Sequence, residues 1–198
     1  MARIIAGSAK GRRIAAPKGD RTRPTTDRVR EALFSALASW FDTTDGDPTE
    51  QLAGLSVLDL CAGSGAIALE AASRGAARVV AVEQDRQTAA LIEANAKDAR
   101  LRVEVRAARA EQFASAAGEA FDLVFLDPPY DADIVDDVLA ALVTHGRLAP
   151  RALMVVERSA RGTAPVWPAV FTDVWERGYG ETVLYFGATD EIQPTRGE

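Results

Sequence analysis

The residues best suited to chemistry are four consecutive ones, Asp127, Pro128, Pro129 and Tyr130, directly after the apolar run 123–126. That run is typical of a buried strand, and the prolines end it because proline fixes φ and restricts the preceding residue. The turn should therefore hold the Asp127 carboxylate and the Pro128 carbonyl nearly fixed, beside the ring of Tyr130. Two acceptors beside an aromatic ring suit the flat exocyclic amine of a nucleobase. An ordinary β-turn is the alternative interpretation.

A glycine-rich motif lies upstream, in the sequence VLDLCAGSGAIA at residues 57–68. It predicts a strand, a tight turn and the start of a helix, with Ala62, Gly63 and Gly65 lining a cofactor. Gly63 and Gly65 permit positive φ and let a ligand approach the backbone, and the helix N-terminus presents unpaired N–H groups. The spacing also fits the G-x-G-x-x-G/A pattern of dinucleotide-binding proteins. The glycines alone therefore do not identify the cofactor.

Two carboxylates favour a cationic cofactor. Asp59 stands at the end of the strand before the glycine turn, where it would repel a pyrophosphate and attract the ammonium and sulfonium groups of S-adenosylmethionine. Glu83 ends the next expected strand, at the distance at which an acidic side chain binds ribose hydroxyls. We assign Glu83 and its neighbour Gln84 to the cofactor, and Asp85 to the N-cap of a helix over 86–97. A helix-capping or turn role is the alternative for Asp59.

Three blocks of sequence resemble the RsmD-type methyltransferases. They are RIIAG, KGRR and PKG within residues 3–19, RPTTDRVREALF at 23–34, and the glycine loop together with DPPY. The block at 23–34 is the specific one, because cofactor loops and DPPY also occur in adenine methyltransferases. The resemblance extends to about Tyr185. It implies transfer of a methyl group from S-adenosylmethionine to the exocyclic N2 amine of a guanine in 16S ribosomal RNA, in a subunit or an assembly intermediate.

The resemblance also implies what binds the adenine of the cofactor. Many such enzymes place an acidic or amide residue there, whereas this chain has Ala107-Ala108-Arg109-Ala110-Glu111. We therefore expect the backbone N–H of Ala110 to serve the adenine. Cys61, where a relative might have glycine, is expected to pack as a small buried residue.

Charge is distributed unevenly along the chain. The net charge is −6, yet residues 1–30 contain nine Lys or Arg against two Asp, which gives +7 and leaves −13 for the remaining 168 residues. A basic arm before an acidic body suits capture of a phosphate backbone, although such runs are also common on solvated faces. The resemblance implies that arginines of the arm contact RNA phosphates and that its two threonines lie near the cofactor or the base. The expected substrate-binding residues are Lys10, Arg12, Arg13, Arg23, Thr25, Thr26 and Arg28.

The chain has one cysteine, Cys61, and one histidine, His145. An intramolecular disulfide and a thiolate-cluster metal site are excluded, and a zinc site or a Ser-His-Asp arrangement has little support. His145 falls at an expected helix exit, where a polar residue is ordinary. We expect no metal, and we expect chemistry to use carboxylates, carbonyls and the cofactor.

Apolar strands that alternate with helical segments along the sequence predict an α/β fold. We expect a Rossmann-like methyltransferase sheet, mostly parallel, with seven strands of which the last is antiparallel, and an N-terminal β-hairpin and helix as an extension. The expected parts are a basic RNA-binding extension at 1–41, a linker at 42–53, a catalytic domain at 54–188 and a disordered tail at 189–198.

Further elements follow from the apolar pattern. A hairpin is expected within 3–16, and a helix starts near Thr26 or Asp27 with Trp40 and Phe41 in the core. Beyond the DPPY turn we expect a helix over 131–142 and a strand over 152–156. A closing hairpin is expected from 171–176 paired with 182–186.

No apolar run reaches membrane-spanning length and no signal peptide is visible, so we expect a cytoplasmic protein, as a monomer. Three other functions stay open. The first is an adenine-N6 DNA methyltransferase, because the DPPY motif suits the exocyclic amine of either purine. The glycine pattern Gly63-x-Gly65-x-x-Ala68 fits a NAD-binding oxidoreductase. A non-catalytic RNA-binding module would leave DPPY unexplained.

Overall fold

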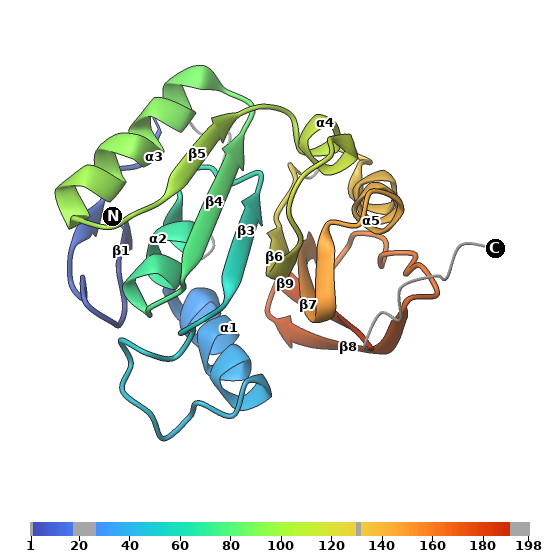
Figure 1. Ribbon diagram of the computed structural model, residues 1–198, viewed down its shortest axis with the longest axis horizontal. Coiled ribbons are helices and arrows are strands. Elements are labelled where there is room, and N and C mark those ends of the chain that lie inside the picture. The colour runs from blue at the N-terminus through green and yellow to red at the C-terminus, as the bar shows by residue number, and fades with distance from the viewer. Residues whose placement is uncertain (1, 18–26, 130–131, 191–198) are drawn as a thin grey trace.

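A seven-stranded sheet forms the centre of the computed structural model, which describes residues 2–17, 27–129 and 132–190 (Figure 1). Its order is β5-β4-β3-β6-β7-β9-β8. β9 runs antiparallel to both of its neighbours, and the four other pairs are parallel. The predicted mostly parallel sheet with an antiparallel last strand is therefore confirmed. The strands are β3 (Ser56–Leu60), β4 (Arg78–Glu83), β5 (Glu104–Ala107), β6 (Phe121–Leu126), β7 (Leu148–Ser159), β8 (Phe171–Tyr179) and β9 (Thr182–Thr189).

The central strands β3, β4 and β6 are mostly apolar because both faces of the sheet are covered. Successive residues of one strand point to opposite faces, so Val57 packs in one cluster and Leu58 in the other. Helices α1 (Asp27–Trp40), α2 (Ala66–Ser73) and α3 (Arg86–Ala99) supply buried residues to the first cluster. Helices α4 (Ala110–Ser115) and α5 (Val135–Thr144) pack in the second.

The N-terminal hairpin packs on the outer side of α2 and α3. Its strands β1 (Ala2–Arg3) and β2 (Arg13–Ile14) pair antiparallel, as predicted. Ile4 and Ile14 are buried with residues of α2 and α3 in a third, smaller cluster. The buried Glu70 carboxylate accepts the backbone N–H groups of Ile5 at 2.7 Å and Ala6 at 3.0 Å. The arm is thus fixed to α2 by polar contacts and to both helices by apolar ones.

Two expectations differ from the structure. Helix α5 begins at Val135 rather than at residue 131, because the backbone first makes a turn in which the Ala132 N–H donates to the Pro129 carbonyl at 2.9 Å. Trp40 is 40% exposed rather than in the core. It lies at the end of α1 and stacks on Trp175 of β8 with ring centroids 4.9 Å apart, so the edge strand covers it only in part.

The remaining boundaries lie close to the prediction. β7 is longer than the strand expected at 152–156, and the closing hairpin of β8 and β9 is present. Asp85 is the N-cap of α3, with its side chain accepting the Thr88 N–H at 2.8 Å. Exposed His145 is the C-cap of α5, as expected.

Among the described residues, no helix is long and apolar enough to cross a membrane.

Candidate active site

The carboxyl ends of β3, β4 and β6 meet at one edge of the sheet. Leu60 of β3 is in register with Val82 on one side and Leu126 on the other. The residues that come directly after these three positions, Cys61, Glu83 and Asp127, therefore lie at the same edge. The strand order reverses at β3, since β4 and β5 extend the sheet on one side and β6 and β7 on the other. Such switch points are where open α/β sheets bind ligands.

The glycine loop after β3 has an unusual backbone. Cys61, Gly63 and Gly65 all have positive φ, at 61°, 53° and 78°. A Cβ at Gly65 would lie 2.7 Å from Ile92 Cγ2, so packing against α3 requires glycine there. A Cβ at Gly63 would meet nothing within 4 Å, so this glycine faces open space. The loop therefore leaves space on the side of Gly63 to which a Cβ would point, and cofactor binding there stays a prediction.

Glu83 ties the end of β4 to this loop. One carboxylate oxygen accepts the Gly63 N–H at 3.0 Å, and the other accepts the Asp85 N–H at 2.9 Å. The side chain is half-buried and its neighbour Gln84 is exposed. Glu83 therefore contacts the backbone of the loop, and cofactor binding by Glu83 and Gln84 stays a prediction.

Asp59 lies inside β3, two residues before the loop, and is 2% exposed. One carboxylate oxygen accepts the backbone N–H of Ala68 in the first turn of α2 at 3.0 Å. Burial raises its pKa to about 7, while the bond from Ala68 acts in the opposite direction and the charge of Glu83 adds to the increase. The helix-bonding role that sequence left as the alternative is thus present. A direct contact with the cofactor stays a prediction.

Acidic side chains surround Cys61. Burial, followed by the negative charges of Glu83, Asp127, Asp59 and Glu111, raises the pKa of the thiol to about 12. Such a thiol stays protonated, which agrees with the expected packing role. The carboxylates of Glu83, Asp127 and Glu111 around this residue also create a field that attracts a cation and repels a pyrophosphate. These residues fit a sulfonium cofactor better than a dinucleotide.

The DPPY turn follows β6 directly. The backbone N–H of Asp127 donates to the Leu60 carbonyl at 3.3 Å, which holds the start of the turn against the end of β3. Asp127 is half-buried, Pro128 is buried and Pro129 is exposed. Tyr130 lies outside the described residues. The turn therefore places its carboxylate next to the glycine loop.

Ala110 begins helix α4 just after β5, at the same edge, and is buried. The Ala108 N–H donates to the Glu83 carbonyl at 3.1 Å and holds this segment beside β4. The Arg109 guanidinium pairs with Glu111 at 2.7 Å. Its side chain is therefore already engaged, and the adenine contact through the Ala110 N–H stays a prediction.

Sequence comparison agrees with this architecture. Residues 2–188 match the family model described as "Conserved hypothetical protein 95". The chain is 34% identical over 168 residues to "Ribosomal RNA small subunit methyltransferase D" of Escherichia coli K12, covering 84% of this chain and 79% of the relative. The chain belongs to the RsmD-type methyltransferase family.

Solved structures show the same fold. The Escherichia coli protein yhhF is 32% identical, with a TM-score of 0.82 over 96% of this chain and 98% of that one. A more distant structure, SMU.776 complexed with SAH, is 15% identical, with a TM-score of 0.58 over 81% of this chain and 48% of that one. At that identity the likeness shows the shared fold alone.

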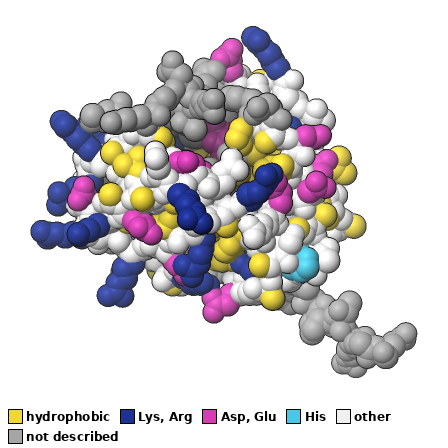
Figure 2. Space-filling model, turned by 90° about the horizontal axis from the view of Figure 1, so that it is seen from above, with side chains coloured by type: hydrophobic (Ala, Val, Ile, Leu, Met, Phe, Trp, Pro, Cys, Tyr) yellow, Lys and Arg dark blue, Asp and Glu magenta, His cyan; other side chains and the backbone are white. Residues whose placement is uncertain are grey.

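The arm of this family member presents cations to solvent. Lys10, Arg12, Arg13 and Arg28 are exposed. Arg23, Thr25 and Thr26 lie outside the described residues. Figure 2 views the molecule from above Figure 1, and on this face Lys and Arg side chains are spread among Asp and Glu side chains. Phosphate contacts by the arm stay a prediction.

Asn95 of α3 is a residue that the sequence did not single out. It is 5% exposed and bonds both to the arm and to the glycine loop. The available signal was its position on the apolar stripe of α3, three residues after buried Ile92 and next to buried Ala96. A polar residue on a buried stripe requires partners.

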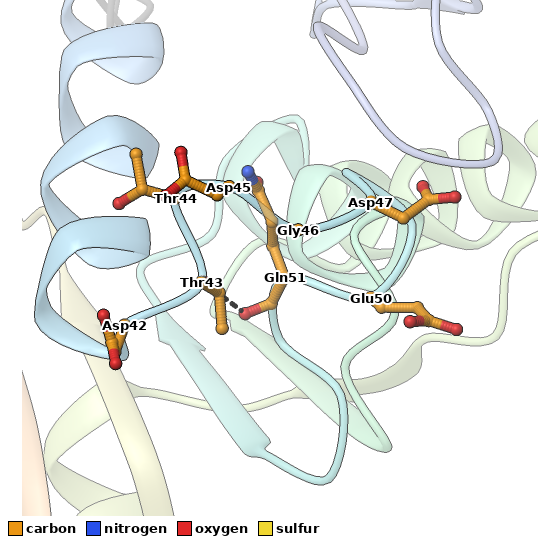
Figure 3. A pocket seen from close by; sticks show the side chains of 8 residues that line it. All are labelled: Asp42, Thr43, Thr44, Asp45, Gly46, Asp47, Glu50 and Gln51. Atoms are coloured by element: carbon orange, nitrogen blue, oxygen red, sulfur yellow. Dashed lines mark hydrogen bonds between the residues drawn. The ribbon is translucent and has the colours of Figure 1, made fainter.

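A separate surface pocket of about 260 Å³ lies in the segment 42–51, which leads from α1 to the amino end of β3 (Figure 3). Thr43 Oγ1 donates to the Gln51 carbonyl across it at 3.1 Å. Since the carboxyl ends of the strands lie at the opposite edge, this pocket is not part of the candidate site. Among the described residues, no group of His, Cys, Asp and Glu side chains is arranged to hold a metal ion.

Proposed function

We propose that the protein transfers a methyl group from S-adenosylmethionine to the exocyclic N2 amine of a guanine in 16S ribosomal RNA. The observation that carries this proposal is the placement of Asp127 and the Gly63 loop at the ends of adjacent strands, in one acidic switch point of the sheet. Membership of the RsmD-type family and the name of the Escherichia coli relative support ribosomal RNA as the substrate.

The cofactor site in this proposal consists of the loop 61–65 and the carboxylates around it. In this proposal the cofactor lies against the backbone at Gly63, where a Cβ would meet no atom, and Glu83, which accepts the Gly63 N–H, also accepts the ribose hydroxyls. Bound S-adenosylmethionine would supply a methyl group on a sulfonium, an electrophile that needs no covalent enzyme intermediate. The carboxylates of Glu83 and Asp127, whose negative charges act on Cys61 of the same loop, favour that positive charge.

The protein's own contribution to the reaction is orientation. The Asp127 carboxylate and the Pro128 carbonyl accept hydrogen bonds from the target amine, and Tyr130 stacks on an unpaired or flipped base. These acceptors draw the amine out of conjugation, so its lone pair faces the methyl donor. Holding the two reactants in line supplies most of the acceleration. The same acceptors stabilise positive charge that develops on the amine, and Asp127 is placed to receive the proton.

The arm binds the RNA in this proposal. Exposed Lys10, Arg12, Arg13 and Arg28 neutralise phosphates, and Arg23, Thr25 and Thr26 complete the substrate-binding set. The arm is fixed on α2 and α3, whose N-termini lie at the cofactor edge. Binding of phosphates there would therefore hold the RNA in a defined position relative to Asp127.

Transfer of labelled methyl groups tests the proposal against its rivals. Purified protein and labelled S-adenosylmethionine are incubated with unmethylated small ribosomal subunits, free 16S ribosomal RNA, and DNA. We expect label in the RNA, at one nucleotide that mass spectrometry identifies as N2-methylguanine. Label on DNA as N6-methyladenine would instead establish the adenine methyltransferase. In a thermal-shift assay, a protein that is stabilised by NAD and not by S-adenosylmethionine would instead be a dinucleotide-binding enzyme.

A further inference from the structure

The side chain of Asn95 joins the N-terminal arm to the glycine loop. Its Oδ1 accepts the backbone N–H of Ala15 at 3.0 Å, and its Nδ2 donates to the Ala15 carbonyl at 3.0 Å and to the Ser64 carbonyl at 3.1 Å. A primary amide has two N–H donors, so both are used, one on each segment. Ala15 is 49 residues from Ser64 in the sequence, and one buried group therefore links two distant segments.

Each of the two segments has a separate function in the proposal above. Ser64 lies between Gly63 and Gly65, in the loop assigned to the cofactor. Ala15 directly follows β2, where the chain leaves the hairpin, and residues 18–26 with Arg23, Thr25 and Thr26 come next in the sequence. Asn95 is thus bonded to the point where the RNA-binding hairpin ends.

The carboxamide orientation is set by its surroundings. The Ala15 N–H faces Oδ1, and the carbonyls of Ala15 and Ser64 face Nδ2. The reversed orientation would place the amide N–H donors against the Ala15 N–H and the amide oxygen against the two carbonyl oxygens. Aspartate has the same shape but no donor, so it would face two carbonyl oxygens with negative charge. Burial of the side chain keeps water from replacing the lost bonds.

We infer that Asn95 is a positioning residue that couples the RNA-binding arm to the cofactor loop, so that RNA and S-adenosylmethionine each strengthen the binding of the other. The inference rests on the proposed function. A ligand on either segment orders Asn95, and the second ligand then meets a segment that is already held. By linkage the coupling factor is the same in both directions.

Calorimetry of S-adenosylhomocysteine binding, with and without saturating unmethylated small subunits, measures this coupling. For the wild type we expect the affinity to rise about five-fold or more when subunits are present, within the usual range of coupling between sites. For Asn95→Asp the factor falls to about one. Lys97→Gln is the matched control, because it removes one positive charge from an exposed position of the same helix. It should keep the wild-type factor.

Hydrogen exchange supplies a second readout. In the wild type, S-adenosylhomocysteine binding should slow exchange of the Ala15 amide, whereas in Asn95→Asp that effect is lost. If Asn95→Asp fails to fold, Ala15→Pro removes the N–H that Asn95 accepts, and Ala16→Pro is its control. Calorimetry with these two variants then decides the same question.

The outcomes separate the two proposals. A wild-type factor of one, or an unchanged factor in both Asn95→Asp and Ala15→Pro, overturns the coupling and leaves the methyltransferase proposal intact. A wild-type protein that binds neither S-adenosylhomocysteine nor subunits overturns the proposed function itself. A factor that is lost in the variants and kept in their controls establishes Asn95 as the coupling residue.

Discussion

The Asp59 carboxylate and the backbone N–H of Ala68 form a buried hydrogen bond of 3.0 Å that closes the glycine loop. Asp59 belongs to β3 and Ala68 to the first turn of α2, so the bond fixes both ends of the segment between them. The bond therefore limits the conformations that are open to this segment. The cost of this arrangement is a carboxylate that is removed from water.

This bond predicts a dependence of stability on pH. The pKa of Asp59 is about 7 in the folded protein, against 3.8 for the ordinary side chain. Between these values the folded state binds a proton that the unfolded state has lost, so stability present at low pH is lost as pH rises through about 7. Urea denaturation from pH 4 to pH 8 should show the free energy of unfolding of the wild type falling relative to Asp59→Asn.

Asp85→Asn is the opposite-sign control for that series. The hydrogen bonds from Thr88 lower the pKa of Asp85, so its contribution is lost only as pH falls below the ordinary value of 3.8 and should stay nearly constant from pH 4 to pH 8. Parallel pH profiles of the wild type and Asp59→Asn would show that Asp59 is ionised in the folded protein at every pH tested.

Gly63→Ala and Gly65→Ala should separate cofactor binding from folding. Alanine at Gly63 meets open space, so it costs only the strain of its positive φ, about 1 kcal/mol, but its methyl group enters the proposed cofactor site. Alanine at Gly65 must displace Ile92 and should lower the free energy of unfolding by more. Thermal denaturation and calorimetry with S-adenosylmethionine measure the two effects. Unchanged affinity in Gly63→Ala would exclude a ligand beside this glycine.

Asp127→Ala should abolish methyl transfer while S-adenosylmethionine binding stays largely intact. Loss of an acceptor that stabilises charge in the transition state commonly costs about 100-fold or more in kcat. Single-turnover transfer to small subunits and calorimetry with the cofactor give the two values. Asp133→Ala, exposed in the same loop region, is the control. Wild-type turnover by Asp127→Ala would remove Asp127 from its proposed role.

Changing Lys10, Arg12 and Arg13 together to Ala should weaken RNA binding and flatten its dependence on salt. Each lost phosphate contact lowers the slope of log K against log salt by about 0.7 to 0.9. Filter binding across a salt series measures the slope, and calorimetry should show nearly unchanged cofactor affinity. Arg177→Ala, on the edge strand β8, is the control for a lost surface charge. A large loss of cofactor affinity in the triple variant would assign the arm to the cofactor site.

Cys61 should resist alkylation while the protein is folded. A pKa of about 12, against 9.0 for the ordinary thiol, leaves roughly 1000-fold less thiolate at neutral pH. Labelling by iodoacetamide at pH 7.5, followed by mass spectrometry, should be very slow in buffer and fast in urea. Rapid labelling of the folded protein would mean that the thiol is neither buried nor surrounded by negative charge.

Local sequence determined the elements and the motif positions. The mostly apolar segment 57–60 and the apolar run 123–126 specify strands buried on both faces, and a glycine turn follows the first and a Pro-Pro turn the second. Asp85 as an N-cap and the paired hairpin strands β8 and β9 also follow from neighbouring residues. These features were predictable because they depend on contacts within a few positions of the chain.

Tertiary structure alone decided which distant groups meet. Nothing near Asn95 in the sequence indicates that its amide joins Ala15 to Ser64, and nothing near Asp59 shows that burial keeps a proton on it near neutral pH. The partial exposure of Trp40 likewise depends on where β8 ends up in the sheet. The physical reason is common to all three. Burial and long-range hydrogen bonding depend on which surfaces the packed layers bring together. The pattern of neighbouring residues in the sequence does not indicate which distant surfaces these are.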